Sequence, residues 1–467
     1  MLRCRPDQME QTGERGAVEG QMRAFPIHQD SPVEHRGDLP PETDVVVIGG
    51  GVIGVMTAWE LATKGLRVAL LEKGRIAGEQ SSRNWGWIRA QGRDPAELPI
   101  VLEAQRMWQQ IAATFGEDIG LRQGGVAYLA RHAADLAGFE AWLPHARAVG
   151  LDTRLLTRAE TEALIPAKAW HGALWTASDM KAEPWVAVPA MARAAVRAGV
   201  VIREACAVRG LDIAAGRIAG VISERGRIAC SRVVLAGGAW SSLLLRRHGV
   251  RIPQLSVRAT VAATAPVAEV FGGAATDDRL AFRRRSDGGY TLAPAAFHEF
   301  MIGPDAFRAL GKYIPQLRKD ASSTRFLPAA PAGYPDGWTT PRSWADDRPG
   351  PFEAMRILDP RPHAGKVQEL RQLFEQTFPQ AGPIRIEAAW AGMIDTMPDV
   401  VPIVDHVPAL PGLTLATGMA GHGFGIGPGI GRVVARLVAG EDPGFDLRRF
   451  RFNRFSDGSP IDLGPHL

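Results

Sequence analysis

Cysteine is scarce in this sequence. Only Cys4, Cys206 and Cys230 occur among 467 residues. Their number is odd and no two are spaced as Cys-x-x-Cys, so we expect neither a disulfide framework nor a zinc site. No other metal motif is evident. So little cysteine suits a reducing compartment, and we expect a cytoplasmic protein.

An excess of charge is also missing. The formal net charge is +4 for the whole chain, with 22% charged and 46% hydrophobic residues. This is an ordinary globular composition, and so small a charge does not indicate a nucleic-acid partner. The length predicts two or three domains with sizeable cores.

Long hydrophobic runs are absent as well. Residues 1–42 are polar and contain no apolar core of signal-peptide length, so we expect a disordered N-terminal extension. The stretch 407–431 has no charge apart from the titratable His422. Its many glycines and prolines argue against a lipid-exposed helix, and we expect no membrane span.

What the sequence does contain is a strand–turn–helix–strand unit at residues 43–74. Residues 44–48 predict a buried strand, 52–64 a helix and 66–71 a second strand. Gly49, Gly51 and Gly54 form Gly-x-Gly-x-x-Gly at the turn, and Glu72 follows 18 positions after Gly54. The strand, the helix and the distant acid together predict a dinucleotide site.

Each part of this unit has a physical role. The first glycine permits the turn, the second lets a pyrophosphate approach the backbone, and the third lets helix and strand pack closely. The N-terminus of the helix offers unpaired N–H groups to the phosphates. Glu72 is placed to accept hydrogen bonds from a ribose.

A second glycine-rich loop is expected at residues 418–431, before a helix at 429–438. Such a loop is again suited to anion binding, so the two loops can hold both ends of one long cofactor. Between them in the chain, residues 77–93 show no periodicity. Their small and polar residues alternate with Trp85 and Trp87, as suits a segment beside a flat ring.

Four blocks carry a resemblance to a known family. They are VVVIGGGVIG…LLEKG, SSRNWG, VVLAGGAWS (233–241) and WAGMIDTMPDVVPIV followed by GMAGHGFG. Together they resemble the D-amino-acid oxidase family of flavoproteins, which includes glycine oxidase, sarcosine oxidase and gamma-glutamylputrescine oxidase. The resemblance extends from Asp44 to about Arg454.

The family resemblance implies an α/β fold. A Rossmann-like FAD-binding domain would be interleaved with a substrate domain built on an antiparallel or mixed sheet. The expected FAD-binding segments are 43–94, 185–250 and 385–445; the expected substrate-domain segments are 95–184 and 251–384, and 446–467 form a C-terminal tail.

The resemblance also implies non-covalent FAD. Gly392 stands where sarcosine oxidase has the cysteine that bonds its flavin. The cofactor-binding residues implied are Gly49, Gly51, Val52, Ile53, Gly54, Glu72, Lys73, Ser81, Ser82, Arg83, Asn84, Trp85, Gly86, Val208, Ala236, Gly237, Trp240, Gly392, Gly421, His422, Gly423, Phe424 and Gly425.

Substrate recognition departs from glycine oxidase, because Ile394 replaces the arginine that holds a carboxylate there. Arg89 is our candidate for a substrate carboxylate, with a surface ion pair as the alternative. Asp395 is a candidate amine anchor or a strand-end turn residue. His422 is a flavin-site residue or a base. Trp87, Met393 and Phe424 are expected as apolar walls of the substrate site.

The expected reaction is oxidation of the C–N bond of an amine or amino acid. Hydride would pass from the α-carbon to flavin N5, and the resulting imine would hydrolyse. Oxygen or another acceptor would take the electrons, and the oligomeric state stays open. Oxidation of a 2-hydroxy acid or alcohol is the alternative, and a non-catalytic dinucleotide-binding module is a third hypothesis.

Overall fold

The computed structural model describes residues 22–465 and Leu467, and its backbone is organised around two large sheets. The first has six strands in the order β21-β22-β13-β1-β2-β9. All neighbours are parallel except β21 and β22. The strands are β1 (Val45–Ile48), β2 (Val68–Leu71), β9 (Val201–Arg203), β13 (Arg232–Leu235), β21 (Ile403–His406) and β22 (Leu413–Thr417).

The second sheet contains ten strands of mixed direction. Along its main path the order is β19-β18-β14-β17-β16-β15-β5-β7-β6, and β20 also pairs with β14. The strands are β5 (Val126–Ala130), β6 (Thr153–Thr157), β7 (Gly172–Thr176), β14 (Leu255–Thr264), β15 (Ala274–Thr276), β16 (Leu280–Arg284), β17 (Tyr290–Pro294), β18 (His298–Met301), β19 (Thr324–Leu327) and β20 (Ile386–Thr396).

One expected boundary differs from the structure. We placed residues 385–445 with the FAD-binding segments, but β20 pairs antiparallel with β14 from Leu255–Thr396 to Thr264–Ile386. This strand therefore belongs to the ten-stranded sheet. An alternating strand of this kind carries no local signal for which sheet it will join, because partners far along the chain decide the pairing.

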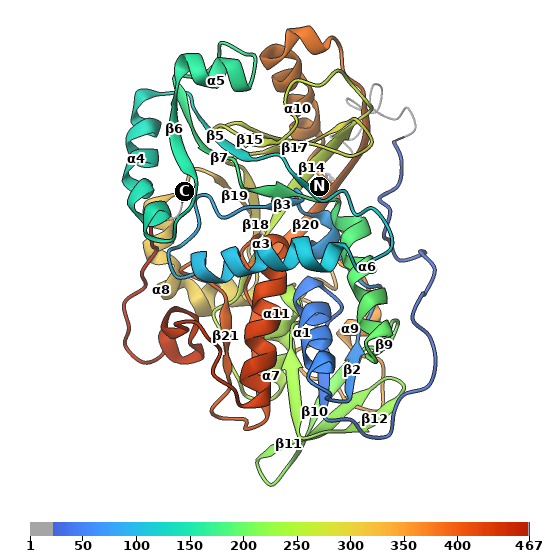
Figure 1. The fold of residues 1–467 in the computed structure, drawn as a ribbon. Coiled ribbons are helices and arrows are strands. Elements are labelled where there is room, and N and C mark those ends of the chain that lie inside the picture. The colour runs from blue at the N-terminus through green and yellow to red at the C-terminus, as the bar shows by residue number, and fades with distance from the viewer. Residues whose placement is uncertain (1–21, 466) are drawn as a thin grey trace, which may run out of the picture.

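Two small sheets complete the strands. One is the predicted meander, β10 (Val208–Ala214), β11 (Arg217–Ser223) and β12 (Gly226–Ala229), at the bottom of Figure 1. The other joins β3 (Trp87–Ile88), β8 (Met180–Lys181) and β4 (Arg122–Gln123). The latter connects the segment after β2 to the region of the larger sheet.

Helices cover both sheets, and α3 crosses α1 and α11 in Figure 1. The α-helices are α1 (Val52–Thr63), α2 (Gln80–Arg83), α3 (Leu98–Ala112), α4 (Ala133–Ala148), α5 (Arg158–Leu164), α6 (Pro184–Arg197), α7 (Ser241–Arg247), α8 (Pro304–Lys319), α9 (Pro351–Ala354), α10 (Ala364–Thr377) and α11 (Gly423–Ala439). Short 3-10 turns lie at Gly238–Trp240, Pro379–Ala381, Arg448–Phe450 and Phe452–Phe455.

The second glycine-rich segment is not a long loop. Helix α11 begins at Gly423, six residues before the predicted start. Its glycines serve close packing: a Cβ on Gly431 would lie 2.6 Å from Cβ of Met56, and one on Gly427 would lie 2.7 Å from Val52. Glycine is usually a weak helix former, but here contact with α1 requires it.

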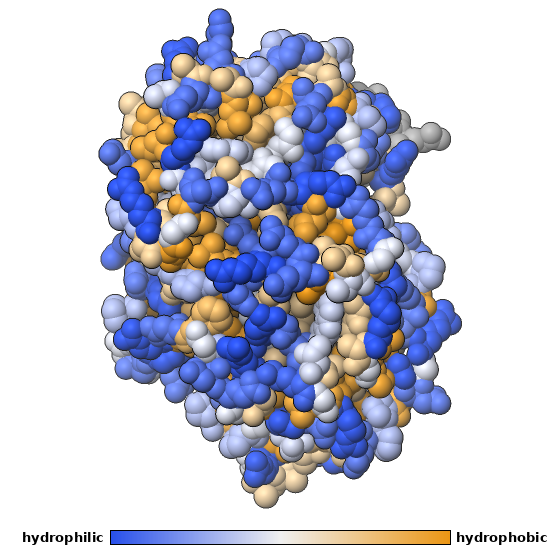
Figure 2. All heavy atoms as spheres, in the orientation of Figure 1, coloured by the Kyte–Doolittle hydropathy of each residue, from blue (hydrophilic) through white to orange (hydrophobic). Residues whose placement is uncertain are grey.

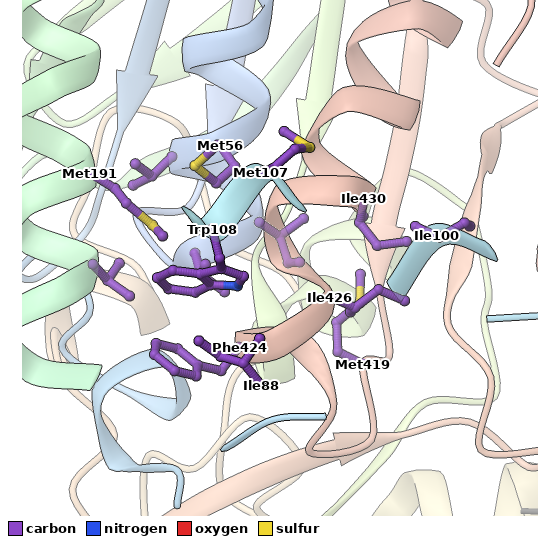
Figure 3. Close-up of a cluster of buried hydrophobic side chains, with 14 of the residues drawn as sticks. Met56, Ile88, Ile100, Met107, Trp108, Met191, Met419, Phe424, Ile426 and Ile430 are labelled. Atoms are coloured by element: carbon purple, nitrogen blue, oxygen red, sulfur yellow. The ribbon is translucent and has the colours of Figure 1, made fainter. Parts of the chain in front are cut away.

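Figure 3 shows the core made by these helices. Trp108 of α3 lies between Met191 of α6 and the first turns of α11. Its ring centroid is 5.0 Å from that of Phe424, and its indole N–H donates to the carbonyl oxygen of Gly425 at 3.0 Å. Trp108 thus holds the start of α11 against α3.

The expectation of a disordered extension is wrong for residues 22–42; residues 1–21 lie outside the described part. The backbone N–H of Arg23 donates to the Glu387 carbonyl, and the ring of Phe25 packs 5.1 Å from Trp390. Glu204, almost fully buried, accepts from the backbone N–H groups of Glu34 and His35. The polar composition of residues 22–42 gave no indication of these long-range contacts.

Hydrophilic residues cover most of the face shown in Figure 2, with smaller apolar areas between them. This is the ordinary pattern for a folded chain, since apolar atoms contribute about half of such surfaces. Within residues 22–465, no helix has the length and hydropathy required to cross a bilayer.

Candidate active site

A cavity of about 400 Å³ lies at the carboxyl ends of β1, β2, β13 and β22. This edge of an open parallel sheet is where ligands bind in such folds. The start of α11, the segment around α2 and residues from β14, β18 and β20 form the remaining walls. Both glycine-rich segments therefore meet in one cavity.

The glycines of the first turn lie in close contact with neighbouring backbone and side chains. Gly49 has φ +110°, and a Cβ there would lie 2.4 Å from the Ala236 carbonyl oxygen. Gly51 lines the cavity, where a Cβ would lie 2.9 Å from Oγ of Ser81. Gly54 does not line the cavity, because it packs under the turn, with a Cβ position 2.0 Å from the Gly49 carbonyl oxygen. Val52 and Ile53 line the cavity at the start of α1.

Glu72 lies on the cavity wall at the end of β2. Its Oε2 accepts from the N–H of Gly50 at 2.7 Å, and its Oε1 accepts from the N–H of Gly74 at 2.6 Å. Burial raises the pKa of this carboxyl to about 6, against the opposing effects of Lys73 and the two N–H groups. Each carboxylate oxygen retains a lone pair for a further donor such as a ribose hydroxyl.

The segment around α2 supplies part of the cavity wall. Ser81, Arg83, Asn84 and Trp85 line it. Oγ of Ser81 accepts from the N–H of Val52 at 2.9 Å and ties the segment to α1.

Two residues predicted beside these do not line the cavity. Oγ of Ser82 is buried and donates to the Ala77 carbonyl at 2.5 Å. Gly86 has φ +77°, and a Cβ there would lie 2.5 Å from the Ala182 carbonyl oxygen. Both residues shape the segment rather than face the cavity.

Val208, Ala236, Gly237 and Trp240, which were predicted as cofactor residues, also line the cavity. Lys73 lines it too: its Nζ lies 2.6 Å from Oε1 of Glu79 and 4.3 Å from the Trp240 ring centroid. This part of the wall combines backbone groups with an aromatic ring.

Of the second glycine segment, Gly421, His422, Gly423 and Phe424 line the cavity. Gly425 does not, because it packs on β3, with a Cβ position 3.1 Å from the Trp87 carbonyl oxygen. Nδ1 of His422 lies 3.3 Å from Oε2 of Glu97, which is completely buried. His422 is therefore held by a carboxylate behind the cavity wall.

Strand β20 contributes three residues to the cavity wall. Gly392, Ile394 and Asp395 line it, whereas Met393 packs into the core on the other face with Met301 and Tyr334. The prediction of Met393 as a substrate wall is therefore wrong, because successive side chains of a strand point to opposite faces. Ile394 takes the wall position.

Asp395 has its hydrogen-bonding capacity largely used within the fold. Its Oδ2 accepts from the N–H of Gly418 at 2.7 Å, from Nε2 of Gln254 at 2.9 Å and from Oγ1 of Thr417 at 3.3 Å. Burial raises the pKa of this carboxyl. These bonds join β20 to the end of β22, so the carboxylate has a structural role that an amine anchor would have to displace.

The wall formed by β3 and the loop after it is strongly polar. Trp87, Arg89 and Arg93 all line the cavity. Nε of Arg93 donates to the Arg89 carbonyl at 3.4 Å, while its Nη1 is buried with no hydrogen-bond partner in the described part of the chain. The indole N–H of Trp87 is also buried there without an acceptor. Two buried donors without a partner in the described part of the chain therefore belong to residues of this wall.

Arg93 is only 3% exposed, and the carboxylate of the completely buried Glu97 lies close enough to act on its charge. Burial, followed by the charge of Arg89, lowers the pKa of Arg93 to about 9, while Glu97, Tyr128 and Asp179 act in the opposite direction. A buried guanidinium in this state would be stabilised by an anion in the cavity.

Asp179 holds the loop that carries both arginines. It is completely buried and accepts from the N–H of Ala90 at 2.7 Å, from the N–H of Gln91 at 3.3 Å and from Nε2 of Gln105 at 2.8 Å. Burial raises the pKa of Asp179 to about 6. These hydrogen bonds therefore fix the backbone of the loop at Ala90 and Gln91.

Two titratable residues that the proposed chemistry uses, Arg93 and His298, are among the cavity residues not predicted from the sequence. Arg93 follows Arg89 by four positions in the same irregular loop, and that proximity was the available signal. His298 comes from β18 of the ten-stranded sheet, and burial lowers the pKa of its imidazole. Nothing near His298 in the sequence relates it to the glycine turns.

The residues present fit FAD. Backbone N–H groups gather at the starts of α1 and α11, where anions bind favourably. The turn before α1 has no room for side chains at Gly49 and Gly51, where a Cβ would meet the Ala236 carbonyl oxygen and Oγ of Ser81 respectively. No group of three histidine, cysteine or acidic side chains among the described residues could hold a metal ion.

Comparison with known proteins agrees with this site. The family model for DAO, FAD dependent oxidoreductase, matches residues 44–437. Sarcosine oxidase subunit beta of Rhizobium meliloti is 26% identical, covering 92% of this chain and 93% of its own. Glycine oxidase of Geobacillus kaustophilus is also 26% identical, covering 88% and 97%.

Solved structures show the same fold. L-amino acid deaminase from Proteus myxofaciens, in complex with anthranilate, superimposes with a TM-score of 0.85 at 29% identity, covering 95% of this chain and 97% of that one. Glycine oxidase from Geobacillus kaustophilus gives a TM-score of 0.71 at 23% identity, covering 89% and 99%.

The predicted fold class, enzyme class and cofactor are thereby confirmed. The matched region includes both glycine segments, Glu72 and β20, so it spans the whole cavity. The chain belongs to the DAO family of FAD-dependent oxidoreductases.

Proposed function

We propose that this enzyme oxidises the C–N bond of an α-amino acid whose carboxylate is held by Arg89 and Arg93. The observation that carries the proposal is the buried Arg93 side chain on the cavity wall beside Arg89, with no hydrogen-bond partner for its Nη1 among the described residues. Guanidinium groups bind carboxylates through two parallel hydrogen bonds. An amine without a carboxylate would leave this charge unmatched.

The surrounding residues supply position and a dry environment. Trp87, Ile394 and Phe424 form apolar walls that exclude water from the reacting carbon. His298 stays neutral because burial lowers its pKa, and its imidazole accepts the proton that the substrate ammonium must lose. FAD, when bound, supplies the acceptor for the hydride from the α-carbon.

The relatives favour this substrate class, since those named above take their names from glycine, sarcosine and L-amino acids. We also propose that the enzyme works in the cytoplasm and passes electrons to oxygen or to another acceptor. Peroxide production in air separates these two acceptors.

An anaerobic flavin-reduction screen tests the proposal. Each α-amino acid, of both hands and with N-methyl forms, is compared with the amine that lacks its carboxylate. We expect amino acids to bleach the flavin and the matched amines to remain inert at the same concentration. Equal bleaching by the amines, or bleaching by 2-hydroxy acids alone, would overturn it; the second result would favour the alcohol-oxidising alternative.

A further inference from the structure

Helix α8 has two apolar faces, and only one of them is packed. Ala309 and Tyr313 face inward, and the Tyr313 hydroxyl donates to the Thr396 carbonyl at 2.8 Å. Phe307, Leu310 and Ile314 face outward with 63%, 50% and 39% of their surfaces exposed. Their spacing of three and four residues places them in one stripe along the helix.

A tryptophan from the proline- and tryptophan-rich segment 328–352 extends this stripe. Trp338 is 55% exposed, and its ring centroid lies 6.0 Å from that of Phe307. Its indole N–H donates to the Ile302 carbonyl at 3.0 Å, which fixes the ring beside the helix. We call Phe307, Leu310, Ile314 and Trp338 the α8 patch.

The charged residues around the α8 patch are mainly basic. The Arg308 side chain is 53% exposed and pairs with Asp305, and Arg318 and Lys319 are exposed at the end of the helix. Two acids lie nearby: Asp305 is 8% exposed and also pairs with Arg246, and the exposed Asp320 accepts from Ser322 and Ser323. Basic residues therefore outnumber acids along the stripe.

We propose that the α8 patch binds the surface of a bilayer containing anionic phospholipids, with α8 lying in the interface. Apolar side chains on one face with lysine and arginine beside them are what a helix requires to lie on a membrane. Tryptophan is favoured at the level of the headgroups. The basic residues complement anionic lipid, which attracts lysine and arginine near the membrane surface.

This mode of binding is distinct from a membrane span. Helix α8 carries charged residues outside its apolar stripe. It can therefore lie on a bilayer but not cross one. The protein would remain a folded enzyme attached by one face. The binding does not depend on which substrate the cavity accepts.

Vesicle sedimentation of the flavin-loaded full chain tests the proposal. Vesicles of phosphatidylcholine alone are compared with vesicles of phosphatidylcholine and phosphatidylglycerol at low and high salt. We expect the protein to pellet with the anionic vesicles at low salt and to be largely released from them at high salt. Neutral vesicles should bind it weakly.

Two variants separate the contributions. Phe307→Ser with Leu310→Ser should reduce partitioning at least ~10-fold, because the two serines bury far less apolar surface in the bilayer. Arg318→Glu with Lys319→Glu should reduce it ~10-fold or more at low salt only. Ile213→Ser, at a residue 40% exposed in the distant meander, and Arg217→Glu are matched controls that should bind normally.

Flavin content and thermal unfolding of each variant show whether it is folded. Failure of the wild-type chain to pellet with anionic vesicles would overturn the proposal, as would an equal loss in the control variants. So would self-association in analytical ultracentrifugation that the Phe307→Ser/Leu310→Ser variant abolishes without any vesicle binding; the patch would then join two copies of the chain.

Discussion

Nε of Arg93 donates to the carbonyl oxygen of Arg89 at 3.4 Å, so the backbone of one arginine positions the guanidinium of the other. Both side chains line the same cavity wall. Arg89 also lies over the Tyr128 ring, 5.4 Å from its centroid. The loop thus brings two positive charges to the same cavity. An anionic group of the substrate would reduce the repulsion between them.

Arg93→Met should raise KM for the best amino acid about 10- to 100-fold, because a charged hydrogen bond is worth about 1.5–3 kcal/mol. Steady-state kinetics with that amino acid measures this. Arg106→Met, at an exposed residue of α3, is the control and should leave KM unchanged. An unchanged KM in the Arg93 variant would contradict the carboxylate assignment.

Gly431→Ala should lower the free energy of unfolding by about 1–3 kcal/mol, since overpacking a tight contact costs that much. The new methyl group would lie 2.6 Å from Cβ of Met56 and 2.8 Å from its carbonyl carbon. Gly311→Ala is the matched helical control: nothing lies within 4 Å of its Cβ position, so it should gain up to about 1 kcal/mol. Denaturant unfolding of both variants checks the sign of each change.

Glu72 should make the stability of the flavin-free protein depend on pH. Its carboxyl has a pKa of about 6 in the folded chain against 4.5 in its ordinary state, so the folded form binds more protons between these values. The protonated Glu72 carboxyl therefore makes its full contribution to the free energy of unfolding below pH 4.5. This contribution is lost as the pH rises through 6, and the free energy of unfolding falls by about 2 kcal/mol.

The measurement is the wild-type free energy of unfolding minus that of Glu72→Gln across this pH range. The difference should fall as pH rises, and Glu140→Gln, at an exposed residue of α4, should show no such slope. A flat difference for the Glu72 variant would show that the carboxyl is not buried as described.

Asp395→Ala should destabilise the fold by about 1–3 kcal/mol, because the buried N–H of Gly418 and the amide of Gln254 would lose an acceptor. Asp395→Asn, which keeps a carbonyl oxygen, should lose less. We expect KM for the substrate to change little in either folded variant. A large rise in KM at unchanged stability would instead support the amine-anchor prediction.

The unit from β1 to Glu72 could be predicted from the sequence because its signals are local. These signals all lie within one strand–helix–strand unit. They are four consecutive buried residues in β1, glycines at fixed offsets and an acid after β2. The glycines of α11 were harder to interpret. Glycine ordinarily ends a helix, and only contact with α1 explains Gly427 and Gly431 inside one.

The sequence by itself determined the two cofactor-facing turns, the parallel strands that feed them and the family to which these belong. Only the tertiary structure decided that β20 joins the ten-stranded sheet, which turns Ile394 toward the cavity and Met393 away from it. The tertiary structure also decided that Arg93 and His298 line the same cavity. The physical reason is that backbone turns and periodicity are encoded by near neighbours, whereas burial and unmatched charge depend on segments hundreds of residues apart.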